Sequence, residues 1–247
     1  MRHIKSIALA ASTAAALMLG SGMASANNVV TVNTVQIFGT VDPAKINDYT
    51  EYMAGVNLYE ALTTLDGSGA IQPLLSESWS TSADGLTWTF KLKKGATFQD
   101  GSPIEAKDVV WSVNRLLAIN EGPAYLFEGV LSEGSVTEID SSSVQFKLEK
   151  TYAPFLTTTP ILFVVNSDLA KENAGDGDPW AQDYVANNSI GAGAFYLDSW
   201  ERGAGMTIKA YEGYHLGWSD TGIDEVRFVV TNEEATVKAL AASGELS

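Results

Sequence analysis

The sequence contains no cysteine and only two histidines among its 247 residues. Without cysteine the protein has no disulfide, no thiolate metal site and no cysteine-linked lipid anchor. His3 lies in a leading segment described below, so His215 is the only imidazole in the rest of the chain. A lone histidine among aromatic residues and glycines is typical of a packed or surface position. Zinc sites and Ser-His-Asp or Cys-His nucleophilic sites therefore have almost no ligands or bases to use.

The apolar run near the amino terminus is too short for a permanent membrane span. It covers residues 7–20, follows Arg2 and Lys5, and precedes the small-residue sequence Ala24-Ser25-Ala26. A spanning helix needs roughly 20 apolar residues. The pattern predicts that residues 1–26 are a secretory signal peptide, cleaved on export to the periplasm. An uncleaved anchor is the alternative, and the Ala-x-Ala site argues against it.

Positive charge is scarce. Residues 27–247 keep 13 of the 15 basic residues and all 30 acidic residues, which gives a net charge of −17. A chain this acidic should repel nucleic acid and anionic lipid, so we expect no nucleic-acid partner. The acidic residues are scattered, which favours a role in solubility over an acidic pocket for a cationic ligand.

Strand and helix patterns mix along the chain without strict alternation. Asp84-Gly85 and Asp140-Ser141-Ser142 each separate two runs of alternating apolar and polar residues, which predicts two hairpins. The expected strands are residues 28–38, 79–82, 86–93, 135–139, 144–150, 161–165, 191–200, 206–211 and 223–230, and the expected helices are residues 50–62 and 232–242. This composition of elements indicates a mixed α/β (α+β) fold.

The segment 97–117 has the outline of a strand, a glycine turn and a helix. It offers one glycine, Gly101, and no Gly-Lys-Ser/Thr, so it is not a phosphate loop. Ser102 to Glu105 fits a capping box with Ser102 at the N-cap, although the helix could equally begin three residues later. In both cases the segment ends a strand and starts a helix.

Catalytic motifs are absent. Gly175 to Asp178 lacks the ladder of acidic residues that a calcium loop uses, so a solvated loop is expected there. A pair of carboxylates could still perform acid-base hydrolysis, which keeps a secreted hydrolase as the alternative function. A periplasmic chaperone or adhesion module would need an exposed apolar patch.

Several motifs of the central segment together resemble the family 5 extracellular solute-binding proteins. They are Trp79, Asp84-Gly85, Trp88-Thr89-Phe90-Lys91-Leu92, Lys94-Gly95, Phe98-Gln99-Asp100-Gly101-Ser102-Pro103 and Ala106-Lys107-Asp108-Val109. Asp42-Pro43, Tyr59-Glu60-Ala61-Leu62, Tyr152-Ala153-Pro154-Phe155 and Ser189 to Phe195 are similar to further family landmarks in the same order. The sequence departs from the family at Ala192, Ala194 and Tyr211 to His215, which affects local turns and points to a subfamily with its own ligand.

The resemblance implies a periplasmic-binding-protein-like architecture. Residues 27–59 and 166–247 would form lobe I, and residues 60–165 would form a small inserted α+β domain II. The family's second large lobe would begin where this sequence stops, so we expect the chain to be truncated, with lobe I incomplete. A truncated chain is expected to bind solute weakly and to associate.

The resemblance also implies the function of a periplasmic solute-binding component of an ABC importer, not an enzyme, with no cofactor and no metal. Its partners would be a small-molecule or peptide ligand and the membrane permease, and the full-length protein would be a monomer. Peptide, opine, sugar oligomer and metal chelate all remain open as the ligand. The expected ligand-binding residues are Asn47, Asp48, Tyr49, Tyr52, Tyr125, Phe127 and Thr159.

Overall fold

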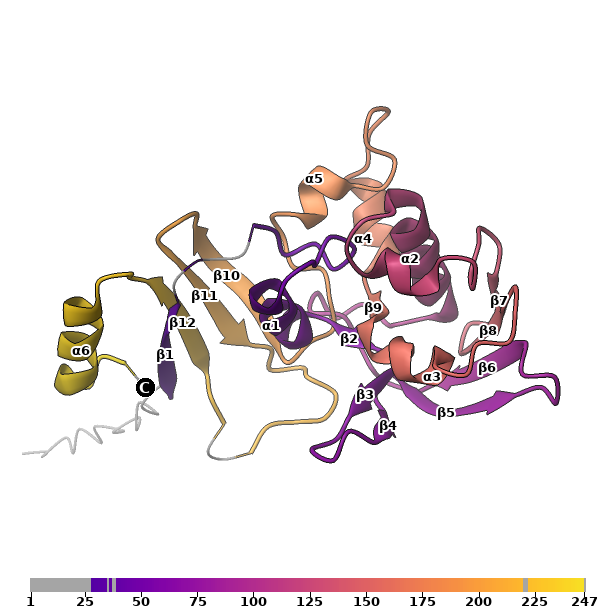
Figure 1. Ribbon diagram of the computed structural model, residues 1–247, viewed down its shortest axis with the longest axis horizontal. Helices are drawn as coiled ribbons and strands as arrows, with labels where there is room; N and C mark the ends of the chain where they lie inside the picture. The colour runs from indigo at the N-terminus through magenta and orange to yellow at the C-terminus, as the bar shows by residue number, and fades with distance from the viewer. Residues whose placement is uncertain (1–27, 35, 37–38, 220–221, 247) are drawn as a thin grey trace, which may run out of the picture.

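The computed structural model describes residues 28–34, 36, 39–219 and 222–246. Figure 1 shows two sheet-containing units side by side along the long axis of the molecule. The predicted signal peptide, residues 1–26, lies outside the described residues. None of the described helices combines the length and the apolar character of a bilayer-spanning segment.

The first unit is built on a four-stranded sheet ordered β1-β12-β11-β10. Its strands are β1 (Val29–Thr34), β12 (Glu225–Val230), β11 (Gly205–Ala210) and β10 (Phe195–Glu201). β1 and β12 run parallel, whereas the other pairs are antiparallel. Helix α1 (Tyr49–Leu58) lies against this sheet and buries Ala54 and Leu58 in the same apolar core as Ile208 and Phe228 (Figure 1).

The second unit holds an antiparallel sheet ordered β5-β6-β8-β7. Its strands are β5 (Ser76–Thr81), β6 (Thr87–Leu92), β8 (Ser143–Lys147) and β7 (Val136–Asp140), so both predicted hairpins are confirmed. The apolar face holds Phe90 and Phe146, whose rings meet edge to face at 5.5 Å. Helix α2 (Ala106–Ile119) covers the sheet with Val109, Val113 and Leu116, the helical spacing visible in the sequence.

Short elements connect the two units. β2 (Glu60–Ala61) pairs with β9 (Phe163–Val164), and β3 (Thr63–Leu65) pairs with β4 (Ile71–Pro73). The remaining elements are η1 (Gly122–Phe127), α3 (Phe155–Thr158), η2 (Thr159–Ile161), α4 (Ser167–Glu172), α5 (Gln182–Val185) and α6 (Glu234–Ser243). The chain crosses between the two apolar cores near residues 61 and 163. The domain division expected from the sequence, residues 27–59 with 166–247 and residues 60–165, stays a prediction.

Glycines of the segment 189–195 let it pack closely against the end of α1. A Cβ atom on Gly191 would lie 2.2 Å from the Leu58 carbonyl oxygen, and one on Gly193 would lie 2.2 Å from the Asn57 carbonyl oxygen. Gln99, from the turn before α2, donates from its side chain to the carbonyls of Leu58 at 3.0 Å and Phe195 at 2.5 Å. The turn that resembles a cofactor motif in the sequence is therefore scaffold.

The structure corrects the end of one predicted helix, decides between the two possible starts of another, and shortens one predicted strand. The helix predicted for residues 50–62 ends at Leu58, because Tyr59 is extended and the Leu58 carbonyl oxygen accepts from the Gly193 N–H at 3.1 Å. Ser102 does not cap α2; the helix takes the later start, with Glu105 as N-cap and its N–H donating to the Asp108 carboxylate at 2.9 Å. Ser102 instead donates to Asp100 within the turn. The strand expected at 161–165 is shorter than predicted.

Candidate functional site

The loop before α1 is fixed to the second unit by a buried ion pair. Asp42 and Arg115 are both almost fully buried, and each carboxylate oxygen of Asp42 lies 2.6 Å from a guanidinium nitrogen. Arg115 also donates to the Trp180 carbonyl at 2.8 Å, and Asp42 accepts from the Ala44 N–H at 2.9 Å. The pair therefore holds the loop that leads to Asn47 against α2.

The polar end of this loop starts α1. Asp48 is the N-cap, and its carboxylate accepts from the Glu51 N–H at 2.8 Å and from the Thr50 hydroxyl at 2.7 Å. These bonds, with that of the Glu51 N–H the strongest, hold the pKa of Asp48 below its usual range. Glu51 in turn accepts from the Asn47 N–H at 3.0 Å. The contacts give Asp48 a structural role, and they leave the side chain of Tyr49 76% exposed at the surface.

The structure brings Tyr125, another of the predicted aromatic residues, to the same region. Helix η1 packs so tightly on the loop that a Cβ atom on Gly122 would lie 2.7 Å from the Ile46 carbonyl oxygen. Tyr125 follows in η1 and is 71% exposed. Two exposed tyrosines therefore stand on adjoining segments that are far apart in the sequence.

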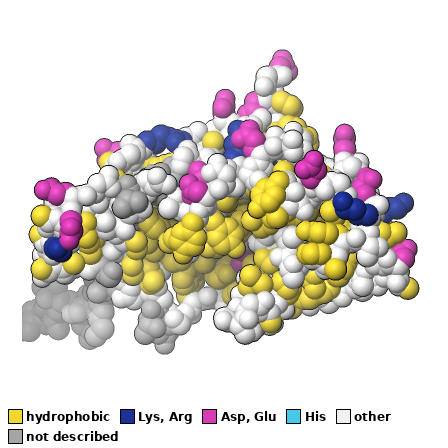
Figure 2. Space-filling model, in the orientation of Figure 1, with side chains coloured by type: hydrophobic (Ala, Val, Ile, Leu, Met, Phe, Trp, Pro, Cys, Tyr) yellow, Lys and Arg dark blue, Asp and Glu magenta, His cyan; other side chains and the backbone are white. Residues whose placement is uncertain are grey.

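Tyr52 lines a groove along α1. The groove has a volume of about 160 Å³ and apolar walls that include Val56, Leu65, Pro160 and Phe163. The Tyr52 and Phe163 rings pack at 6.2 Å, and partial burial raises the pKa of Tyr52. Figure 2 shows hydrophobic side chains gathered across the middle of the face on which α1 lies.

Two expected ligand residues are buried. Phe127 and Thr159 have no exposed surface. The Thr159 hydroxyl lies 2.5 Å from that of Thr63 and donates to the Leu156 carbonyl at 2.8 Å, so its bonds are within the fold. Neither side chain reaches the α1 groove, and we leave both out of the proposed contacts.

A carboxylate that the sequence analysis did not single out lies at the floor of the α1 groove. Glu60 is 3% exposed and accepts from the Tyr214 hydroxyl at 2.7 Å, while its other oxygen lies 2.6 Å from His215 Nε2. Burial, and then the Glu60 charge, raise the pKa of Tyr214. His215 is thus a packed residue, as its sequence setting predicts. Because 154 and 155 residues separate the partners, no local pattern could have found this cluster.

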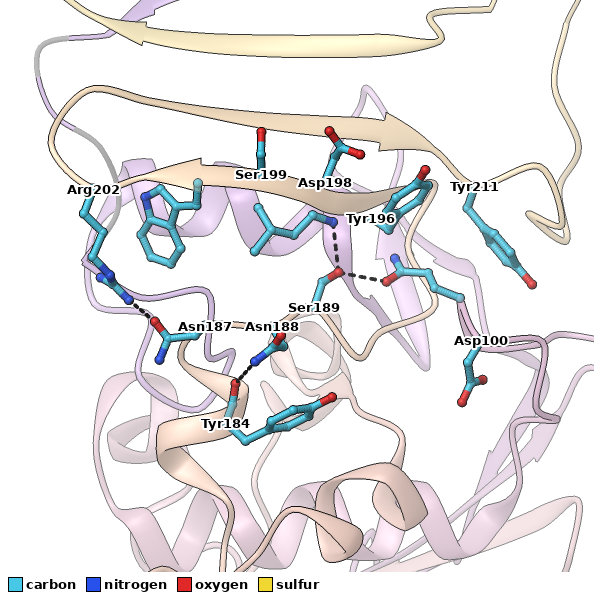
Figure 3. Close-up of a pocket in the computed structure, with 13 residues that line it drawn as sticks. Asp100, Tyr184, Asn187, Asn188, Ser189, Tyr196, Asp198, Ser199, Arg202 and Tyr211 are labelled. Carbon is cyan, nitrogen blue, oxygen red and sulfur yellow. Dashed lines mark hydrogen bonds between the residues drawn. The ribbon is translucent and has the colours of Figure 1, made fainter.

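A larger polar groove, of about 530 Å³, runs beside β10 (Figure 3). Many of its polar groups are already bonded: Ser189 accepts from the Leu197 N–H at 2.9 Å, Asn187 accepts from Arg202, and Asp198 pairs with Lys209 at 2.9 Å. It contains none of the expected ligand residues. We therefore place the candidate site on the α1 face, despite the larger volume beside β10.

Metal binding receives no support from the part of the chain that the structure describes, which has no cluster of three or more His, Asp or Glu side chains placed to hold an ion. Glu60 is also the one carboxylate lining the α1 groove, and both its oxygens have partners. This geometry suits recognition by aromatic faces and hydrogen bonds.

Comparisons with known proteins find one matching family model and several similar sequences. A model described as bacterial extracellular solute-binding proteins, family 5 (middle part), matches residues 70–247. The chain is 33% identical over 214 residues to the probable D,D-dipeptide-binding periplasmic protein DdpA of Escherichia coli strain K12, covering 84% of this chain and 40% of that protein. It is 31% identical over 211 residues to the dipeptide-binding protein of the same strain, covering 77% of this chain and 38% of the relative.

Solved structures show the same fold. The substrate-binding domain of an oligopeptide ABC transporter from Bacillus anthracis strain Ames matches with a TM-score of 0.77 and 26% identity, covering 90% of this chain and 45% of that one. The pheromone receptor PrgZ matches with a TM-score of 0.78 at 22% identity, covering 90% and 46%. The chain thus spans less than half the length of these relatives.

Proposed function

The chain belongs to the family 5 bacterial extracellular solute-binding proteins. We propose that it takes part in binding a peptide-like solute in the periplasm and delivering it to an ABC permease. The periplasmic setting is supported by the names of the relatives, which include periplasmic and dipeptide-binding proteins. The comparisons give no support to the secreted hydrolase.

The observation that carries the proposal is that two exposed tyrosines follow segments that pack together. Tyr49 and Tyr125 come from segments that pack together at Gly122, and each exposes more than two thirds of its surface. Tyrosine offers a flat apolar face and a hydroxyl at its edge, which suits the alternating apolar and amide groups of a peptide. The Asn47 side chain adds an amide that can both donate and accept.

The α1 groove adds a place for an apolar side chain. Its volume of about 160 Å³, with walls from Val56, Leu65 and Phe163, suits a small aliphatic group. Tyr52 links this groove to the loop at Asn47 because it lies in the first turn of α1. We infer that Asn47, Tyr49, Tyr52 and Tyr125 contact the ligand and that Asp48 positions them by capping the helix.

The experiment is an NMR titration of the isotopically labelled chain with L-Ala-L-Ala and D-Ala-D-Ala, with maltotriose as a sugar oligomer of comparable polarity. The proposal expects saturable shifts for a dipeptide, centred on Asn47, Tyr49 and Tyr125. Saturable shifts at these residues with maltotriose alone would reject the peptide and favour the sugar oligomer. Shifts confined to the groove beside β10 would reject the site.

A further inference from the structure

A separate cavity lies in the second unit. It has a volume of about 440 Å³ and is enclosed by the last turns of α2, by η1, by residues 128–133 and by Trp180. It shares no lining residue with the α1 groove. The volume falls in the range of small-molecule sites, which is roughly 300–1,000 Å³.

The walls of this cavity are mainly apolar. Asn114, Leu117 and Ala118 are spaced by three and four residues, so they share one face of α2, and this face lines the cavity. Leu131 and Trp180 also line it. Phe127, expected from the resemblance to contact the transported solute, is among the residues around this cavity, and none of its surface is exposed.

Three acceptor groups of this cavity suit a hydrogen-bond donor or a cation. Asn114 Oδ1 is buried and has no hydrogen-bond partner in the described chain. Glu128 and Glu133 line the cavity, are exposed, and form no salt bridge with a described residue. No Lys, Arg or His is among the residues that line the cavity.

One ammonium group lies nearby. A Cβ atom on Gly129 would be 3.3 Å from Lys150 Nζ. Gly129 lines the cavity and lies between Glu128 and Glu133 in the sequence, so Lys150 stands beside this rim. A single lysine can offset one of the two carboxylate charges. The rim therefore keeps a net negative charge above an apolar wall that includes the indole of Trp180.

We propose that this cavity binds a small organic cation: an apolar body against Leu117, Ala118 and Trp180, with its ammonium group at Glu128 and Glu133. An indole face and a carboxylate both attract an ammonium group, and the apolar walls exclude water from the body of the ligand. The inference does not depend on the function proposed for the α1 groove.

The test uses 2-phenylethylammonium as the probe, with 2-phenylethanol and 3-phenylpropanoate as neutral and anionic molecules of similar size. NMR titration of the labelled chain should give saturable shifts at Asn114, Leu117 and the Trp180 indole with the cation. The neutral probe should bind about two- to five-fold more weakly, as expected for one exposed charge pair. The anion should bind most weakly. Equal binding of cation and anion, or no saturable shift with the cation, would overturn the proposal.

Variants separate charge from shape. Glu128→Gln with Glu133→Gln should weaken the cation about three-fold or more and leave the neutral probe unchanged, whereas Lys150→Gln should strengthen the cation. Ala118→Trp, at an exposed position of α2, should block all three probes. Glu138→Gln, an exposed acid on β7 outside the cavity, is the matched control and should change nothing. Unchanged cation binding in the double glutamine variant, or in Ala118→Trp, would contradict the proposal.

Discussion

Arg115 and Asp42 meet in a two-point ion pair with N–O distances of 2.6 Å at both contacts, in a place where neither side chain has appreciable exposure. The pair joins the loop of the first unit to the main helix of the second unit. Everything proposed for the α1 face depends on this loop keeping its place, since Asn47 and Tyr49 follow Asp42 by only a few residues.

We predict that Asp42→Asn lowers the free energy of unfolding by about 3–5 kcal/mol, because it leaves the Arg115 charge buried without its partner. The measurement is urea unfolding followed by circular dichroism. Asp168→Asn is the matched control: Asp168 pairs with Lys107 at 2.7 Å at an exposed site, where such a pair contributes less than about 1 kcal/mol. Equal losses in the two variants would contradict the role assigned to the Asp42–Arg115 pair.

Gly193→Ala should destabilise the chain by about 1–3 kcal/mol or more, because a Cβ atom there meets the Asn57 carbonyl oxygen at 2.2 Å and backbone must move. Gly177→Ala is the control, since nothing lies within 4 Å of the corresponding Cβ position. The measurement compares the melting temperatures of the two variants with that of the parent. A Gly193→Ala chain that melts with the parent would show that the end of α1 can shift freely against the segment 189–195.

Asp48 gives a prediction on pH. Its pKa is lowered in the folded chain, so its charged form stabilises the fold above the unfolded pKa of about 3.9. This contribution is lost as the pH falls through the lowered pKa. At pH 7, Asp48→Ala should cost about 1 kcal/mol, and Asp48→Asn should cost little because asparagine is also a good N-cap.

The pH dependence of Asp48→Ala tests the contribution of the Asp48 charge to the start of α1. The stability difference between the parent and Asp48→Ala should shrink below pH 4, which urea unfolding at several pH values measures. A difference that stays constant down to pH 2 would show that the carboxylate charge does not support the helix start.

Local chemistry explains why the sequence predicts some elements well. The Asp84-Gly85 hairpin and the buried face of α2 follow from patterns of a few residues, and both are confirmed. The end of α1 is decided by a segment more than 130 residues away, which takes the Leu58 carbonyl and leaves no room for another helical turn. A helix pattern that continues to Leu62 cannot reveal that contact.

The candidate site shows the same limit. The resemblance points to Asn47, Tyr49 and Tyr125, and the structure places their segments together. The same resemblance also points to Phe127 and Thr159, whose burial depends on packing that the sequence does not display. Glu60, Tyr214 and His215 form a cluster across the two units, and its existence depends on the whole fold.

The dissociation constant of a dipeptide for this chain and for two of its variants tests the central claim most directly. The contacts stand on one open face, so we expect binding near millimolar, about half the free energy of a micromolar site. Tyr49→Ala should weaken this binding several-fold without lowering the melting temperature, whereas Ile139→Ala, a similarly exposed residue on β7, should change neither quantity. Equal dissociation constants for the parent and Tyr49→Ala, with both chains folded, would contradict the account.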